Sequence, residues 1–310
     1  MSLKASLSHR HLMIKVLIWV AVIICLSLIS GIFVSWLPSI TTPAGMRWMQ
    51  LIQMVMLFLL PPLVMAYLLS DQPMQWLYLR KTEEQAKKWR KDYWLWAIGI
   101  MVVALPAINL LGHINSQLSL PTWLSELETM MKELEESANL LIKKMLATQS
   151  FLNMMANLTI MALLPAVAEE LTFRGVLMRL LQPQSSDHGN PTKIPHLAIW
   201  VTAFIFSAVH FQFYGFLPRM LMGALFGYMM VWTGSIWIPM LMHFINNAVA
   251  VLLYFMAERG GWDMATIDAI GTKDTLWLGV LSVVVTCIGI YYFRRSTTIN
   301  RASSRMSNGN

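Results

Sequence analysis

The sequence predicts an all-α membrane protein with about eight helices that cross the bilayer. Of its 310 residues, 56% are hydrophobic and 13% charged, whereas soluble globular proteins average roughly 25% charged residues. The apolar residues form long blocks, each near the ~20 residues that a helix needs to span the hydrocarbon core. The blocks are continuously apolar, without the alternation typical of barrel strands. A soluble globular fold is thereby excluded.

Each expected span is one of these apolar blocks. In chain order they cover about residues 13–37, 46–69, 93–112, 151–181, 196–214, 216–234, 236–257 and 275–293. The first block is too long for a signal-peptide core and no small-residue cleavage site follows it, so we expect it to be retained. Cys25 and Cys287 both fall within spans. We therefore expect no disulfide and no cysteine metal site.

Most of the positive charges lie between alternate spans and at both termini. This set comprises Lys4, Arg10, Lys15, Arg80, Lys81, Lys87, Lys88, Arg90, Lys91, Arg179, Lys193, Arg294, Arg295, Arg301 and Arg305. With eight spans all of these residues fall on one side, which the positive-inside rule makes cytoplasmic. The net charge of +7 thus reflects topology, and we expect no nucleic-acid partner. We expect a multi-pass protein of the bacterial plasma membrane with both termini in the cytoplasm.

The long loop at 113–150 is predicted to contain an amphipathic helix. Over 121–145 its apolar residues recur at alternating steps of three and four, at Leu124, Leu127, Met131, Leu134, Ala138 and Leu141. This periodicity indicates a helix with an acidic outer face. It would lie on the membrane surface or on the bundle, or alternatively act as a lid over a substrate entrance. Residues 1–295 are expected to form one polytopic domain and 296–310 a disordered cytoplasmic tail.

Three ionisable residues stand in the fourth span, where charge is costly and usually kept for a function. Glu170 and Arg174 are four residues apart on one helix face and can form an ion pair. Glu169 is turned by ~100° from Glu170 and has the apolar Phe173 at the fourth position after it. An unpaired carboxylate beside apolar groups suits a general base. The spacing predicts that Glu169 reacts and that Glu170 and Arg174 support it; the alternative is a purely structural salt-bridge network.

Two later spans add further polar residues. His210 follows an apolar run, and His243 and Asn247 are four residues apart, so that both project from one helix face. Two donors aimed at one point are what an oxyanion site requires. Each site alone could equally be a hydrogen bond between helices. The three polar sites together favour a catalytic site over structural hydrogen bonding.

These residues resemble three signatures of the CPBP intramembrane proteases, the CAAX-type prenyl-protein endopeptidases and their bacterial relatives. The signatures are Glu-Glu-xxx-Arg at 169–174, Phe-xxx-His at 206–210 and His-xxx-Asn at 243–247. They occur in the family's order within about residues 150–255, the expected catalytic core. The resemblance implies eight helices around an intramembrane catalytic cavity. It also implies that Glu169 and His210 activate water, that His243 and Asn247 stabilise the oxyanion, and that Glu170 and Arg174 support them.

The expected function is hydrolysis of a peptide bond in a membrane-associated protein or peptide within the bilayer. A zinc-dependent version would use Glu169, His210 and His243 as a His₂Glu ligand set. We favour a reaction without a metal cofactor, because a carboxylate and an imidazole can deprotonate water unaided and no HExxH motif occurs. Two non-enzymatic alternatives are a membrane scaffold or immunity factor, and a transporter that uses the buried Glu and His as a proton relay.

Overall fold

The computed structural model describes residue 7 and residues 11–82, 85–86, 89–182, 194–261 and 263–307. Within these residues the regular structure is helical, and no strand occurs. Six helices are long and apolar enough to cross a membrane. They cover Leu12–Ser35, Pro43–Leu69, Tyr93–Ser116, Phe151–Leu181, Trp237–Gly260 and Lys273–Thr298. The chain is therefore a multi-pass membrane protein, and the predicted all-α fold is confirmed.

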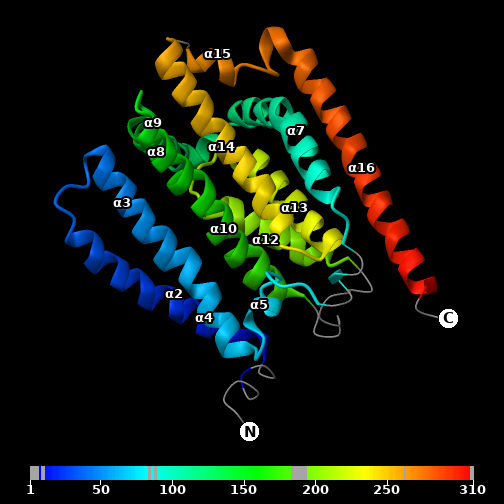
Figure 1. The fold of residues 1–310 in the computed structure, drawn as a ribbon. Coiled ribbons are helices and arrows are strands. Elements are labelled where there is room, and N and C mark those ends of the chain that lie inside the picture. Colours follow the sequence, from blue (N-terminus) through cyan, green and yellow to red (C-terminus); the bar gives the residue numbers. More distant parts are fainter. Residues whose placement is uncertain are drawn as a thin grey trace.

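Figure 1 shows the described helices in their order along the chain. The first half of the chain contains α2 (Leu12–Ser35), α3 (Pro43–Gln53), η1 (Met54–Leu59), α4 (Leu60–Leu69), α5 (Pro73–Trp76), α7 (Tyr93–Ser116), η2 (Thr122–Leu124) and α8 (Ser125–Leu146). One long helix then comprises α9 (Phe151–Asn157), η3 (Leu158–Leu163), α10 (Leu164–Glu170), η4 (Leu171–Leu177) and α11 (Met178–Leu181). The last part contains α12 (His196–Ala208), α13 (Phe216–Thr233), α14 (Trp237–Gly260), α15 (Met264–Asp268), η5 (Lys273–Thr275) and α16 (Leu276–Ser307).

All eight predicted blocks are helical, but two of them are not among the six long apolar helices. The block expected at 196–214 ends as a helix at Ala208, after 13 residues, or about 20 Å at 1.5 Å per residue. The next block, α13, has 18 residues. The shortening has a local cause: residues 211–215 form a non-helical connection, and Phe211 has a φ of 53°, which lies outside the helical region. The count of eight spans is thus approximate.

The central helices carry the polar residues singled out above. In Figure 1, α10, α12, α13 and α14 occupy the middle of the bundle, with α2, α3 and α4 on one side and α7 and α16 on the other. Helix α14 packs against η3, α7, α13 and α10, and α10 also packs against η1. Two clusters of buried apolar side chains surround these contacts. The faces of the middle helices that meet one another are therefore buried, whereas α12 also exposes Leu197, Trp200 and Phe204.

Proline interrupts the backbone hydrogen bonding near the centre and creates attachment points for polar side chains. Pro62 has no N–H to donate to the carbonyl of Phe58, four residues earlier. The hydroxyl of Thr172 donates to that carbonyl instead, at 2.6 Å. A side chain from η4 thus satisfies a carbonyl of η1, as membrane helices with internal proline require.

The amphipathic helix predicted in the long loop is present as α8, but its orientation differs from the prediction. Glu128 and Glu135 face the protein: Glu128 accepts a hydrogen bond from the Tyr214 hydroxyl at 3.4 Å, and Glu135 accepts one from the Tyr214 backbone N–H at 2.9 Å. On the predicted inner stripe Leu127, Leu134 and Leu141 are exposed, whereas Leu124, Met131 and Ala138 are half-buried. The acidic face is therefore not simply the outer one, because two of its carboxylates satisfy donors of the connection that follows His210.

Helix α16 continues to Ser307, into the residues for which a disordered tail was predicted, and that prediction is not tested further. Extending an existing helix requires no new nucleation, and the arginines beyond Arg294 suit the negative end of the helix dipole. Residues 308–310 lie outside the described part of the chain.

Candidate active site

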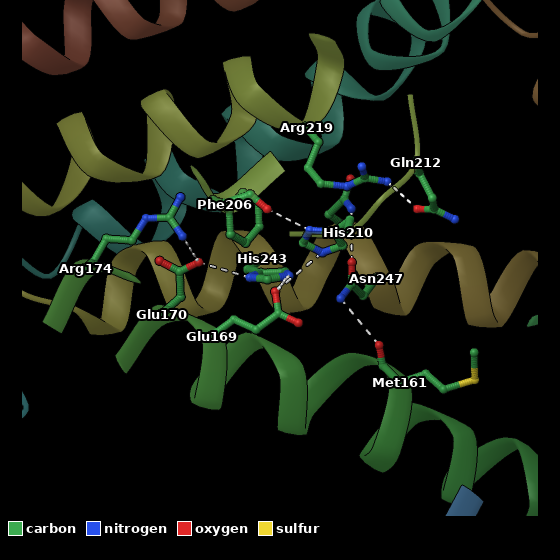
Figure 2. Close-up of polar contacts among 11 residues, drawn as sticks. Met161, Glu169, Glu170, Arg174, Phe206, His210, Gln212, Arg219, His243 and Asn247 are labelled. Atoms are coloured by element: carbon green, nitrogen blue, oxygen red, sulfur yellow. Dashed lines mark hydrogen bonds and ion pairs between the residues drawn. The ribbon is translucent and has the colours of Figure 1, made fainter. Parts of the chain in front are cut away.

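Glu169 and Glu170 are the last residues of α10, between two stretches of π-helix, η3 and η4. Such widened turns are often found at functional sites, because they re-aim side chains along an otherwise regular helix. Both carboxylates are buried: Glu169 is 5% exposed and Glu170 0%. Figure 2 shows the two side chains directed from this helix towards His243 on α14.

Glu170 and Arg174 form the predicted ion pair. The Arg174 Nη1 donates to Glu170 Oε1 at 2.8 Å, and both side chains are fully buried. The second arm of the guanidinium, Nη2, donates to the backbone carbonyl of Gly223 in α13 at 2.8 Å. The guanidinium also lies over the rings of Phe206 and Phe226. The pair thus joins three helices and surrounds its positive charge with a carboxylate, a carbonyl and two ring faces.

Glu170 has a second partner that the spacing did not predict. Its Oε1 lies 3.0 Å from Nδ1 of His243. A carboxylate accepts hydrogen bonds, so Nδ1 is the protonated nitrogen and the opposite nitrogen, Nε2, points away from the pair. Phe226 stacks on the imidazole with ring centroids 5.7 Å apart. The ring of His243 is therefore fixed in position and orientation, with Nε2 directed towards Glu169.

His210 reaches the same point from the other side. Its Nδ1 lies 2.7 Å from the carbonyl oxygen of Phe206. Since a carbonyl can only accept, this Nδ1 also carries the proton, and Nε2 of the neutral ring has a free lone pair. His210 Nε2 and His243 Nε2 each lie 3.9 Å from Oε2 of Glu169. The structure thus brings together three of the four predicted catalytic residues, and Glu169 Oε2 is buried without a hydrogen-bond partner among the described residues.

The two 3.9 Å separations at Glu169 Oε2 are nearer to those around a water molecule than to those between two ligands of a zinc ion. Two ligand atoms 3.9 Å apart with bonds of ~2.1 Å would subtend about 136° at a metal, far from the tetrahedral ~109°. With hydrogen bonds of ~2.8 Å the same separation subtends about 88° at a water oxygen, which a water molecule tolerates. No group of three or more His, Cys, Asp and Glu among the described residues is arranged to hold a metal ion. The zinc set of Glu169, His210 and His243 would require the ligands to move closer together.

Asn247 lies one helical turn beyond His243 but is engaged elsewhere. Its Nδ2 donates to the carbonyl of Met161 at 3.4 Å, and its Oδ1 accepts from Asn246 at 3.1 Å. Met161 precedes Pro165 by four residues, so its carbonyl lacks the usual helical donor. No hydrogen bond joins Asn247 to Glu169, His210 or His243 in the described chain. Its amide would have to leave Met161 before it could act on a substrate.

Two polar residues near the site were missed in the sequence. Arg219, in the first turn of α13, donates from Nη2 to Oε1 of Gln212 at 2.6 Å. Figure 2 shows both residues beside His210, on the side away from Glu170 and Arg174. Arg219 falls within a block predicted to span the membrane. The rule that drew attention to Glu169, that ionisable residues in spans are usually functional, could have found it.

This part of the chain is similar to a known protein family. Residues 151–249 match the family model described as type II CAAX prenyl endopeptidase Rce1-like. The chain is also 34% identical over 93 residues to the uncharacterized protein YpbD of Bacillus subtilis (strain 168). That alignment covers 29% of this chain and 41% of the relative, so the chain spans less than half of that protein. No solved structure matches. The matched range contains all seven defined residues of the three signatures.

Proposed function

We propose, from the Rce1-like domain of the CPBP family that residues 151–249 form, that this protein is an intramembrane endopeptidase. It would hydrolyse a peptide bond of a membrane-associated protein or peptide without a metal cofactor. The observation that carries this proposal is the convergence of Glu169 Oε2 with the Nε2 atoms of His210 and His243, at 3.9 Å each. This spacing suits one water molecule shared by a carboxylate and two imidazoles.

In the proposed reaction this water attacks the carbonyl carbon of the substrate. Glu169 takes one proton from the water, and the Nε2 lone pair of His210 accepts a hydrogen bond from it and aligns it. The proton then passes to the leaving amine, so that Glu169 acts first as base and then as acid. Burial of Glu169 keeps bulk water from competing for its hydrogen bonds.

The oxyanion formed by this attack would be stabilised by His243 and Asn247. Nδ1 of His243 lies 3.0 Å from Glu170 Oε1, and Nε2 lies 3.9 Å from Glu169 Oε2, so Nε2 would have to carry a second proton when the ring acts as a donor. In that form Nε2–H can donate to the oxyanion as it develops. Asn247 would add a second donor after its amide leaves the Met161 carbonyl. Glu170 and Arg174 then act through His243, by holding its ring in place.

The test of this function is a comparison of membrane proteomes. A strain lacking the protein, a strain expressing the wild-type chain and a strain expressing Glu169→Ala at equal membrane levels are compared for uncleaved and cleaved peptides. We expect the deletion and Glu169→Ala strains to accumulate the same uncleaved proteins. If Glu169→Ala restores the wild-type pattern or phenotype, the protein acts as a scaffold or immunity factor. Loss of ion-coupled uptake alone would indicate a transporter.

Metal removal tests the choice of water over zinc. We expect the purified protein to keep its activity after treatment with a zinc chelator, because Glu169 and His210 can activate water directly. Metal analysis of the wild type and of His210→Ala should give the same low zinc content. One tightly bound zinc per wild-type chain, lost in His210→Ala, would establish the zinc-dependent version instead.

A further inference from the structure

Arg219 is a charged residue that the proposed reaction does not use and that the fold does not explain. It lies in the first turn of α13, at the positive end of the helix dipole, where a cation is unfavourable. It belongs to an apolar region in which a guanidinium is costly. Its charge therefore contributes nothing to the stability of its own helix, and a different role must account for it.

The guanidinium of Arg219 is held on one side and free on the other. Its Nη2 donates to Gln212 Oε1 at 2.6 Å, and the group lies against Gly215, where an added Cβ would come within 3.0 Å of Nη2. The second arm, Nη1, is buried and has no hydrogen-bond partner among the described residues. Among the described residues, none of the ion pairs within 4.0 Å includes Arg219. Glu135 and Glu169 act on it only at longer range.

A buried arm of this kind is incomplete without an anion. An unsatisfied buried N–H loses its bond to water and gains nothing in return. Guanidinium groups are the usual partners of carboxylates, because their planar fork offers strong charge-assisted bonds. The guanidinium lies against Gln212 and Gly215. Both residues belong to the connection 211–215, which begins directly after His210. A group bound at Nη1 would therefore lie next to the water that His210 aligns.

We propose that Arg219 forms a subsite for a carboxylate of the peptide substrate, with Gln212 as its positioning residue. The proposal rests on the proposed endopeptidase function, since only a peptide substrate would bring a carboxylate to this place. Binding of the carboxylate would fix the distance between the charged group and the scissile bond. Arg219 would thus determine which bond of an apolar peptide meets Glu169.

Small carboxylate probes test this subsite without requiring cleavage. N-acetyl-leucine carries an α-carboxylate, N-acetyl-leucinamide carries none, and the α-amide of N-acetylglutamate carries only a side-chain carboxylate. Each is titrated against the purified full-length protein, and its affinity is taken from the rise in unfolding temperature, followed by tryptophan fluorescence. We expect at least one carboxylate probe to bind about tenfold more tightly than N-acetyl-leucinamide, the effect of one charge-assisted bond. The probe that binds more tightly shows whether the subsite takes the terminal carboxylate or a side-chain carboxylate of the substrate.

Variants separate recognition from structural support. Arg219→Gln is expected to remove the preference for the carboxylate, and Arg219→Lys, which keeps the charge but lacks the fork, to retain part of it. The matched control is Arg259→Gln, since Arg259 is exposed near the end of α14 and should leave the preference unchanged. Equal binding of all three probes to the wild type, or a preference that survives in Arg219→Gln, would overturn the proposal. Preference for the carboxylate probes without any cleavage would refute only the endopeptidase function. Cleavage without any preference among the probes would refute only the subsite.

Discussion

Replacing Glu169 by glutamine is expected to reduce peptide-bond cleavage by about 10³–10⁴-fold, the contribution of a general base that also positions its water. Glutamine has nearly the same shape but cannot take a proton. Because Glu169 Oε2 has no hydrogen-bond partner among the described residues, the substitution breaks no bond of the fold. The rate is measured on a substrate identified from the proteomes, with purified protein in liposomes, alongside the unfolding temperature.

The control for this substitution is Glu133→Gln on the exposed side of α8, which should cleave at the wild-type rate. His210→Gln should lose activity to a similar extent. The double variant of Glu169 and His210 should lose little more than either single one, because groups that act on one water molecule are not additive. A Glu169→Gln protein that retains more than about a tenth of the wild-type rate would exclude this carboxylate as the base.

Much of the candidate site could be predicted from the sequence because two strong rules apply inside a membrane. Ionisable residues are rare there and usually functional, which identified Glu169 and Glu170. Residues four apart share a helix face, which predicted the ion pair of Glu170 with Arg174. Both rules are local, and the structure confirms the ion pair predicted by the second one, at 2.8 Å.

Contacts between distant helices could not be predicted in this way. The bond between His243 and Glu170 joins residues 73 positions apart, and no spacing within either helix indicates it. Asn247 was expected to point at the oxyanion beside His243. Its amide is instead drawn to the carbonyl that Pro165 leaves without a helical donor. A helical face defines a direction, whereas the partner in that direction depends on how the neighbouring helix is packed and interrupted.

The orientation of α8 was predicted only in part, for a related reason. A period of three to four residues identifies a helix and its apolar stripe, and in a soluble protein that stripe faces the core. Beside a bilayer the stripe can face lipid while acidic residues face protein donors. Glu128 and Glu135 do so at Tyr214. When both the protein core and the bilayer can cover apolar side chains, periodicity therefore cannot tell which face of an amphipathic helix meets the protein.

Removing the charge of Arg174 should have the largest effect on stability. Arg174→Met is expected to destabilise the folded protein by about 3–5 kcal/mol, the usual cost of leaving one member of a buried ion pair alone. Glu170 would remain fully buried without its counter-ion, and the carbonyl of Gly223 would lose its donor. The measurement is the unfolding free energy in detergent, or the shift in unfolding temperature where unfolding is irreversible.

A control at an exposed ion pair and a double variant distinguish the loss of stability in Arg174→Met from a general effect of removing an arginine. Arg90 and Asp92 form an ion pair at 2.6 Å that is 45% and 31% exposed, so Arg90→Met should cost less than ~1 kcal/mol. Combining Arg174→Met with Glu170→Gln should recover part of the lost stability, because no unpaired charge then remains buried. The recovered protein should still be impaired in cleavage, since glutamine at position 170 is a weaker acceptor for Nδ1 of His243. Equal destabilisation at Arg90 and Arg174 would mean that the buried pair holds neither the helices nor the imidazole in place.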